Sequence, residues 1–295
     1  MQILTGRRFG VHSLAFSHCG RWLAAGGRGG IHLWDTSAPA EPPRHFSNTS
    51  AHAGRLTFRP DGYVLWFDEN RNVHTRHAES GAAGIDAPCE EPMGCAAANG
   101  TRAVESWNLG KPHVWELHST AAPVALWVLP YAPGRPDVTG FSHDGALLAA
   151  ARYTRDSPAH AVRVLDADTG VPRCELAHPA TDRPQQLAFS AHNEFLIARW
   201  GASLVCWNLA EQDAKPQRTF NPSRKHFVAM AVHPEGGVLT VANDRLVRVW
   251  DVPSLQPVRT IEWDIGKLYA VAVSPDGSRA AVGSNTGRVL IWDWD

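Results

Sequence analysis

The fold is decided by one stretch, FVAMAVHPEGGVLTVANDRLVRVWDVPSLQPVRTIE, residues 227 to 262. It contains four short runs with the residue types that favour β-strands, Val228 to Val232, Gly237 to Ala242, Leu246 to Trp250 and Val258 to Ile261. The segments between these runs carry the Pro, Gly, Asn and Asp residues that mark turns. The stretch therefore predicts a meander of four strands.

The first turn of this meander recurs along the whole chain. The residues that close its copies are Gly20, Gly62, Gly100, Gly145, Asn193, Gly236 and Gly277, at spacings of 38 to 48 residues. A period near 40 residues is a signature of repeat architectures built from one small unit. Seven copies fill the 295 residues, so we expect an all-β chain with no second domain.

A recurring pair of residues, whose first member is tryptophan in most copies, follows each turn. The pair begins 14 or 15 residues after the turn-closing residue in six copies and 20 residues after it in the fourth. The pairs are Trp34-Asp35, Arg76-His77, Trp115-Glu116, Leu165-Asp166, Trp207-Asn208, Trp250-Asp251 and Trp292-Asp293. Through the tryptophan–aspartate pairs at 34–35, 250–251 and 292–293, and the Pro-Asp-Gly turns at 60–62 and 275–277, the chain resembles the WD-repeat family. The resemblance implies a single seven-bladed β-propeller of four-stranded blades.

The two ends of the repeat array predict how the ring closes. The last repeat stops in its third strand, whereas an additional strand at residues 2 to 9 precedes the first repeat. Pairing these two elements, as WD-repeat proteins do, would remove two exposed sheet edges. We expect residues 1–10 to close the last blade, and blades at approximately 11–50, 51–91, 92–130, 131–179, 180–224, 225–265 and 266–295.

Packing around a propeller axis makes a further prediction. Innermost strands crowd one another at the axis, so side chains there should be small, and five residues before each closing position the chain has Ala15, Thr57, Cys95, Gly140, Ala188, Ala231 and Ala272. The following residues are mostly larger and apolar, as needed to fill the space between neighbouring sheets. They are Phe16, Phe58, Ala96, Phe141, Phe189, Val232 and Val273.

The polar network that pins many WD-repeat blades is mostly missing. The family's aspartate, in the turn before the third strand, is kept in one copy only, as Asp244. We therefore expect these blades to depend more on apolar packing than on buried polar networks.

Composition and motifs give no sign of catalysis. The formal charge is −1, which argues against nucleic acid and membranes as partners. Motifs for a nucleophile elbow, a phosphate loop or a zinc helix are missing, so we expect no catalytic residue, no cofactor and no metal. The alternative is a propeller enzyme such as a metal-dependent hydrolase at the central channel, for which His12 and Asp137 are the available ligands.

Irregular loops suggest where a partner would bind. Blade connections and the loops between second and third strands emerge at one end of a propeller, and two unusual segments lie there. One is the proline-rich connection at residues 130–137, and the other is the fourth copy's insertion at residues 152–158. Arg and Tyr in such loops favour binding hot spots, and Trp200 is expected at a loop tip as an anchor. The candidate partner-binding residues are His12, Tyr131, Arg135, Asp137, Arg152, Tyr153, Arg155, Arg183, Gln185, Trp200 and Tyr269.

These observations favour an interaction scaffold. We expect a protein or peptide partner, bound by a monomer or by a subunit of a larger complex. The first residues lack the apolar run of a signal peptide, so we expect a cytoplasmic protein.

Overall fold

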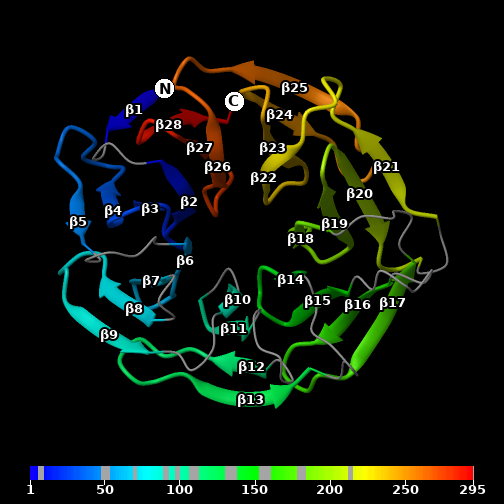
Figure 1. Ribbon diagram of the computed structural model, residues 1–295, viewed down its shortest axis with the longest axis horizontal. Helices are drawn as coiled ribbons and strands as arrows, with labels where there is room; N and C mark the ends of the chain where they lie inside the picture. The colour runs from blue at the N-terminus through cyan, green and yellow to red at the C-terminus, as the bar shows by residue number, and fades with distance from the viewer. Residues whose placement is uncertain are drawn as a thin grey trace.

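The computed structural model describes residues 1–5, 10–47, 54–68, 72–88, 93–96, 100–105, 113–129, 138–152, 161–177, 184–211 and 215–294. These residues form seven antiparallel sheets of four strands each. The sheets surround a common axis as the blades of a propeller (Figure 1), so the predicted fold is confirmed.

We number the blades in the order in which their innermost strands occur. From the innermost strand outward, blade 1 comprises β2 (Val11–Phe16), β3 (Trp22–Gly27), β4 (Gly30–Asp35) and β5 (Arg44–Phe46); blade 2, β6 (Gly54–Phe58), β7 (Tyr63–Phe67), β8 (Asn72–His77) and β9 (Ala83–Pro88); blade 3, β10 (Met93–Ala96), β11 (Arg102–Glu105), β12 (His113–Glu116) and β13 (Val124–Val128); and blade 4, β14 (Val138–Phe141), β15 (Leu147–Arg152), β16 (Ala161–Asp166) and β17 (Pro172–Ala177).

The remaining blades follow the same plan. Blade 5 comprises β18 (Gln186–Phe189), β19 (Phe195–Trp200), β20 (Ser203–Asn208) and β21 (Gln217–Phe220); blade 6, β22 (Phe227–Val232), β23 (Val238–Ala242), β24 (Leu246–Trp250) and β25 (Pro257–Glu262); and blade 7, β26 (Leu268–Val273), β27 (Arg279–Ser284), β28 (Arg288–Asp293) and β1 (Gln2–Thr5).

Strand β1 closes the ring by pairing with β28. The register runs antiparallel from Gln2 opposite Ile291 to Thr5 opposite Arg288. Leu4 is 3% exposed and packs in the same apolar cluster as Val289 and Ile291. The predicted closure is confirmed for residues 2–5, while residues 6–9 of the predicted strand lie outside the described residues.

The small residues of the innermost strands line a central channel, as predicted. Six of the seven predicted positions contribute to its wall, Ala15, Thr57, Gly140, Ala188, Ala231 and Ala272. The side chain of the seventh, Cys95, lies outside the described residues. A Cβ atom at Gly140 would lie 2.4 Å from the carbonyl oxygen of Leu187 in the next blade, so this position requires glycine.

The larger residues that follow pack between blades. Phe58 of blade 2 lies in one cluster with Ile31 and Leu33 of blade 1, and Phe189 of blade 5 lies in one cluster with Val162 and Val164 of blade 4. Blades 2 and 5 therefore each bury an aromatic ring against the preceding blade, which contributes roughly 1.5 to 3 kcal/mol for each ring.

Polar contacts also join neighbouring blades, at the end of the channel where the first turns lie. A basic side chain of one blade donates to the carbonyl oxygen of the turn-closing glycine of the next, and we call this set the turn belt. Its members are Arg279 to Gly20, Arg59 to Gly100, Arg102 to Gly145 and His233 to Gly277. The turn belt was not predicted from the sequence, and it adds polar interblade contacts to the expected apolar packing.

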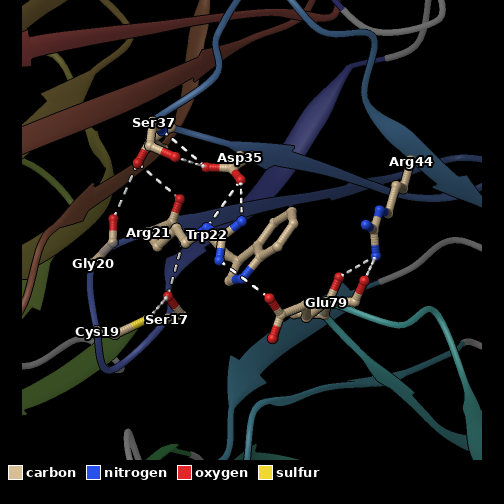
Figure 2. Close-up of polar contacts among 11 residues, drawn as sticks. Ser17, Cys19, Gly20, Arg21, Trp22, Asp35, Ser37, Arg44 and Glu79 are labelled. Carbon is tan, nitrogen blue, oxygen red and sulfur yellow. Dashed lines mark hydrogen bonds and ion pairs between the residues drawn. The ribbon is translucent and has the colours of Figure 1, made fainter.

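Blades 1 and 2 are joined by a different arrangement (Figure 2). Arg21 of blade 1 lies 2.8 Å from the carboxylate of Asp35 and 3.3 Å from that of Glu79 in blade 2. Arg44 donates to the carbonyl oxygen of Ala78, and both guanidinium groups lie about 5 Å from the ring of Trp22. Cation–π contacts and ion pairs here replace the glycine contact of the turn belt.

Candidate functional site

A central channel opens along the axis of the propeller. It has a volume of about 690 Å³ and is walled by innermost strands of six blades, β2, β6, β14, β18, β22 and β26. These strands start at the end where blade connections emerge, which we call the connection end. They finish at the first turns, which we call the turn end.

The Arg, Lys, His, Asp and Glu residues that the structure describes in the channel wall are all basic. The described wall contains Arg199 and four histidines, His12, His18, His143 and His233, but neither Asp nor Glu. The potential inside such a channel is positive wherever these groups are charged, which favours anionic occupants.

Arg199 comes from the second strand of blade 5. Its Nη1 donates to Oε1 of Gln185 at 3.1 Å and to the carbonyl oxygen of Phe227, in blade 6, at 2.5 Å. Burial lowers the pKa of the Arg199 guanidinium to about 10. The side chain thus spans two blades near the connection end and carries a poorly solvated positive charge.

A stacked pair of rings lies at the same end. His12 of blade 1 and Tyr269 of blade 7 face each other with ring centroids 5.0 Å apart and an interplanar angle of 19°. Both line the channel. Flat ring surfaces of this kind provide contact area that loses little conformational entropy on binding.

The turn end has a different chemistry. Burial, and next the nearby imidazole of His143, lower the pKa of His18. The ring of His233 stacks on Trp294 with centroids 4.2 Å apart. Its Nδ1 accepts from the backbone N–H of Glu235, so Nε2 carries the proton that is donated to the carbonyl oxygen of Gly277. His233 is thus held in a structural role.

The structure brings three predicted site residues together around the channel. His12, Gln185 and Tyr269 all line it, and all stand at or next to the start of an innermost strand. Gln185 is held by two contacts, because its Oε1 accepts from Arg199 and from the backbone N–H of Gly201.

Trp200 corrects the prediction of an exposed anchor. It is the last residue of β19, opposite Ser203, with only Gly201 and Ala202 in the turn between them. Its side chain is 3% exposed and packs edge-on against Trp207, with centroids 5.7 Å apart. The prediction that Trp200 is exposed at a loop tip is wrong, because the strand continues through it and turns its ring into the core.

The other predicted residues fall where the structure gives no side-chain information. Arg152 is the last residue of β15, and its side chain is not described. The residues outside the described part are Tyr131, Arg135, Asp137, Tyr153, Arg155 and Arg183.

Arg199 was missed by the sequence analysis, although a signal was present. Arg199 lies two residues after the partner of the small wall residue of blade 5. At this position blades 1, 4 and 7 have Gly26, Ala151 and Gly283, and blades 2 and 6 have Phe67 and Val241. A charged residue where these blades have uncharged ones marks a departure from pure packing.

The described residues offer neither a metal site nor a membrane-spanning helix. Across the described ranges, no three His, Cys, Asp or Glu side chains are grouped so that they could hold a metal ion. No helix long and apolar enough to cross a membrane occurs in the same ranges.

Comparisons with known proteins match the repeats. The family model for the WD40 repeat, described as WD domain, G-beta repeat, matches residues 1–35, 214–251 and 255–293. A curated relative, the small ribosomal subunit protein RACK1y of Oryza sativa subsp. japonica, is 44% identical over 50 residues. The match covers 17% of this chain and only 15% of the rice protein.

Proposed function

The chain is a seven-bladed propeller of the WD-repeat type, and we propose that it is a non-catalytic scaffold that binds a protein or peptide at the connection end of its channel. The observation that carries this proposal is the channel mouth itself, where Arg199, Gln185 and the stacked rings of His12 and Tyr269 lie on the wall of one opening. A guanidinium, an amide and flat rings on a rigid frame are typical of binding hot spots.

The predicted rim residues extend this surface in the proposal. Tyr131, Arg135 and Asp137 belong to the connection into blade 4, while Arg152 ends β15 and Tyr153 and Arg155 follow it in the sequence. Arg183 precedes β18. Since blade connections and second-to-third-strand loops emerge at the connection end, a partner bound at the channel mouth would also meet these residues.

Assembly and location complete the proposal. The partial relative is named as a protein of the small ribosomal subunit, which supports a role within a larger assembly. We propose that the chain acts as one domain, in the cytoplasm, either alone or as a subunit of a complex, without a metal or cofactor.

The test is affinity purification with two matched variants. The connection-end variant carries Tyr131→Ala, Tyr153→Ala, Arg155→Ala and Tyr269→Ala, and the turn-end variant carries His192→Ala, Glu194→Ala and Glu235→Ala. Circular dichroism and thermal unfolding establish that both variants fold. We expect specific proteins, identified by mass spectrometry, to be lost with the connection-end variant and retained with the turn-end variant. Equal recovery by both variants would overturn the proposed face.

A further inference from the structure

The guanidinium of Arg199 lacks a counter-ion among the described residues. The two described hydrogen bonds of this group both start at Nη1, and both acceptors are neutral oxygens, one of an amide and one of a carbonyl. Nε is buried without a hydrogen-bond partner. Nη2 has no described acceptor either and, unlike Nε, is not fully buried. A guanidinium has five N–H donors, so most of its donors here are unused.

Another arginine of the same protein shows the usual arrangement. Arg248 of blade 6 has a side chain that is 5% exposed, and it lies 2.8 Å from the carboxylate of Asp244. Charged groups withdrawn from water are normally paired in this way, since an unpaired one is strongly destabilising. Arg199 is half-buried rather than fully buried, but its Nε is withdrawn from water and no carboxylate among the described residues pairs with the guanidinium.

The surroundings of Arg199 indicate which kind of group would pair with its guanidinium. The described channel wall contributes no carboxylate, and it combines alanines and valines with Gln185, Gln186 and the stacked pair His12 and Tyr269. An occupant that enters from the connection end therefore meets the Arg199 guanidinium in an opening of about 690 Å³ whose other described basic groups are histidines. That volume accommodates a side chain and the backbone that carries it.

We propose that Arg199 is the anchor for the carboxylate of an acidic side chain, presented by a partner peptide that enters the channel at the connection end. This inference rests on the proposed scaffold function and specifies the partner's chemistry. The carboxylate would accept hydrogen bonds from the guanidinium, with its charge matched one to one, and its aliphatic stem would lie against the apolar wall.

Charge balance favours a carboxylate over a phosphate. One guanidinium neutralises one negative charge, whereas a phosphomonoester carries close to two at neutral pH. The described wall offers no second arginine or lysine near Arg199 that would balance the additional charge.

The first experiment tests the site without a partner. In ¹⁵N-labelled protein the Arg199 side-chain resonances are assigned by their loss in Arg199→Lys, and sodium propionate is then added, with propionamide and inorganic phosphate as separate arms. We expect propionate to shift the Arg199 resonances and propionamide to leave them in place. A response to propionamide equal to that to propionate, or none to propionate, would overturn the inference, as would a stronger response to phosphate.

The second experiment uses peptides selected from a random library by the wild-type protein. Replacing the critical Glu or Asp of a selected peptide by Gln or Asn, or using Arg199→Gln protein, should weaken binding roughly 30-fold or more, because either change leaves a buried charge unpaired. Arg218→Gln makes the same charge change on the exposed outer strand of the same blade and should leave affinity unchanged.

The outcomes separate this inference from the function on which it rests. Selected peptides that bind Arg199→Gln as well as wild type would disprove the carboxylate anchor and leave the scaffold intact. Failure to select any peptide, together with a clear propionate response at Arg199, would retain the anion site and count against the scaffold. A thermal midpoint of Arg199→Gln close to that of wild type establishes that lost binding is not lost folding.

Discussion

The guanidinium of Arg279, in blade 7, donates from Nη2 to the carbonyl oxygen of Gly20, in blade 1, at 2.8 Å. Its Nη1 donates to the hydroxyl of Thr36, also in blade 1, at the same distance. Arg279 and Gly20 are 259 positions apart, so their contact fastens the last blade to the first independently of strand β1.

Removing this contact should weaken the ring. We expect Arg279→Met to lower the free energy of unfolding by about 1.5 to 3 kcal/mol, the range for hydrogen bonds that involve a charged group. Urea denaturation followed by tryptophan fluorescence measures the change. Arg288→Met, an exposed site on the same blade, is the control and should change little. Equal effects of the two substitutions would contradict a role for Arg279 in closure.

Gly140 should not tolerate a side chain. The Cβ of Gly140→Ala would lie 2.4 Å from the carbonyl oxygen of Leu187, so blade 4 or blade 5 must shift. We expect a loss of roughly 1 to 3 kcal/mol in unfolding free energy, as for other overpacked cores. Gly10→Ala is the comparison, because the nearest obstacle there is the movable imidazole of His12. A smaller loss for Gly140→Ala than for Gly10→Ala would disprove the close approach of the blades.

The indoles of Trp250 and Trp292 allow a matched test of one hydrogen bond. Nε1 of Trp250 donates to the hydroxyl of Thr240 at 2.8 Å, whereas Nε1 of Trp292 is buried and has no partner among the described residues. Replacement by Phe removes a satisfied donor in the first case and an unsatisfied one in the second. Trp250→Phe should therefore cost about 0.5 to 1.5 kcal/mol more than Trp292→Phe in chemical denaturation. The reverse order would count against the hydrogen bond.

The pairing of β1 predicts opposite sensitivities at neighbouring positions. Leu4 is 3% exposed and Ile3 is 50% exposed, because successive residues of a strand point to opposite faces. We expect Leu4→Ala to cost about 2 to 5 kcal/mol and Ile3→Ala to cost far less. Thermal unfolding of the two variants measures the difference, and similar losses would show that β1 does not pack as described.

The ion pair of Asp35 with Arg21 should make the free energy of unfolding depend on pH. The hydrogen bond from Arg21 is the main cause that lowers the pKa of Asp35 from 3.8 to about 2. A folded-state pKa below the unfolded value contributes stability that is present above about pH 4 and is lost as the pH falls towards 2.

Comparison with a variant isolates this contribution. The stability advantage of wild type over Asp35→Asn should therefore shrink between about pH 5 and about pH 2.5. Asp264→Asn, the same charge change at an exposed site, serves as the control. An advantage over Asp35→Asn that is independent of pH would disprove the ion pair's role.

The ring of blades could be predicted from the sequence because it depends on residue size at a fixed spacing. Ala15, Ala188 and Ala272 recur at one position before each turn, and only crowding at an axis requires that recurrence. The closure by β1 followed from counting strands. The size signal is local in the chain and repeats, so several copies reinforce it.

The contacts between blades could not be predicted in the same way. Among the donors of the turn belt, Arg59 and His233 come before the turn-closing residue of their own blade, whereas Arg102 and Arg279 come after it. The four donors therefore do not occupy one common sequence position. The prediction that Trp200 is exposed was wrong for a related reason. The burial of Trp200 depends on a turn of only two residues, which lets β19 continue through it. A repeat pattern does not reveal where a strand ends to within one residue.

The pairing of β1 with β28 also fixes the order in which the protein can mature during synthesis. β1 leaves the ribosome before every blade, and its partner leaves after all of them, so β1 has an unsatisfied edge for most of translation. Such distant pairs slow folding, because the loop between them must close before the contact forms. The N-terminal amino group lies 3.8 Å from the carboxylate of Asp293, close enough for a short link. A circularly permuted chain with β1 placed after β28 would keep the strand pairing and turn the most distant strand pair into a local hairpin.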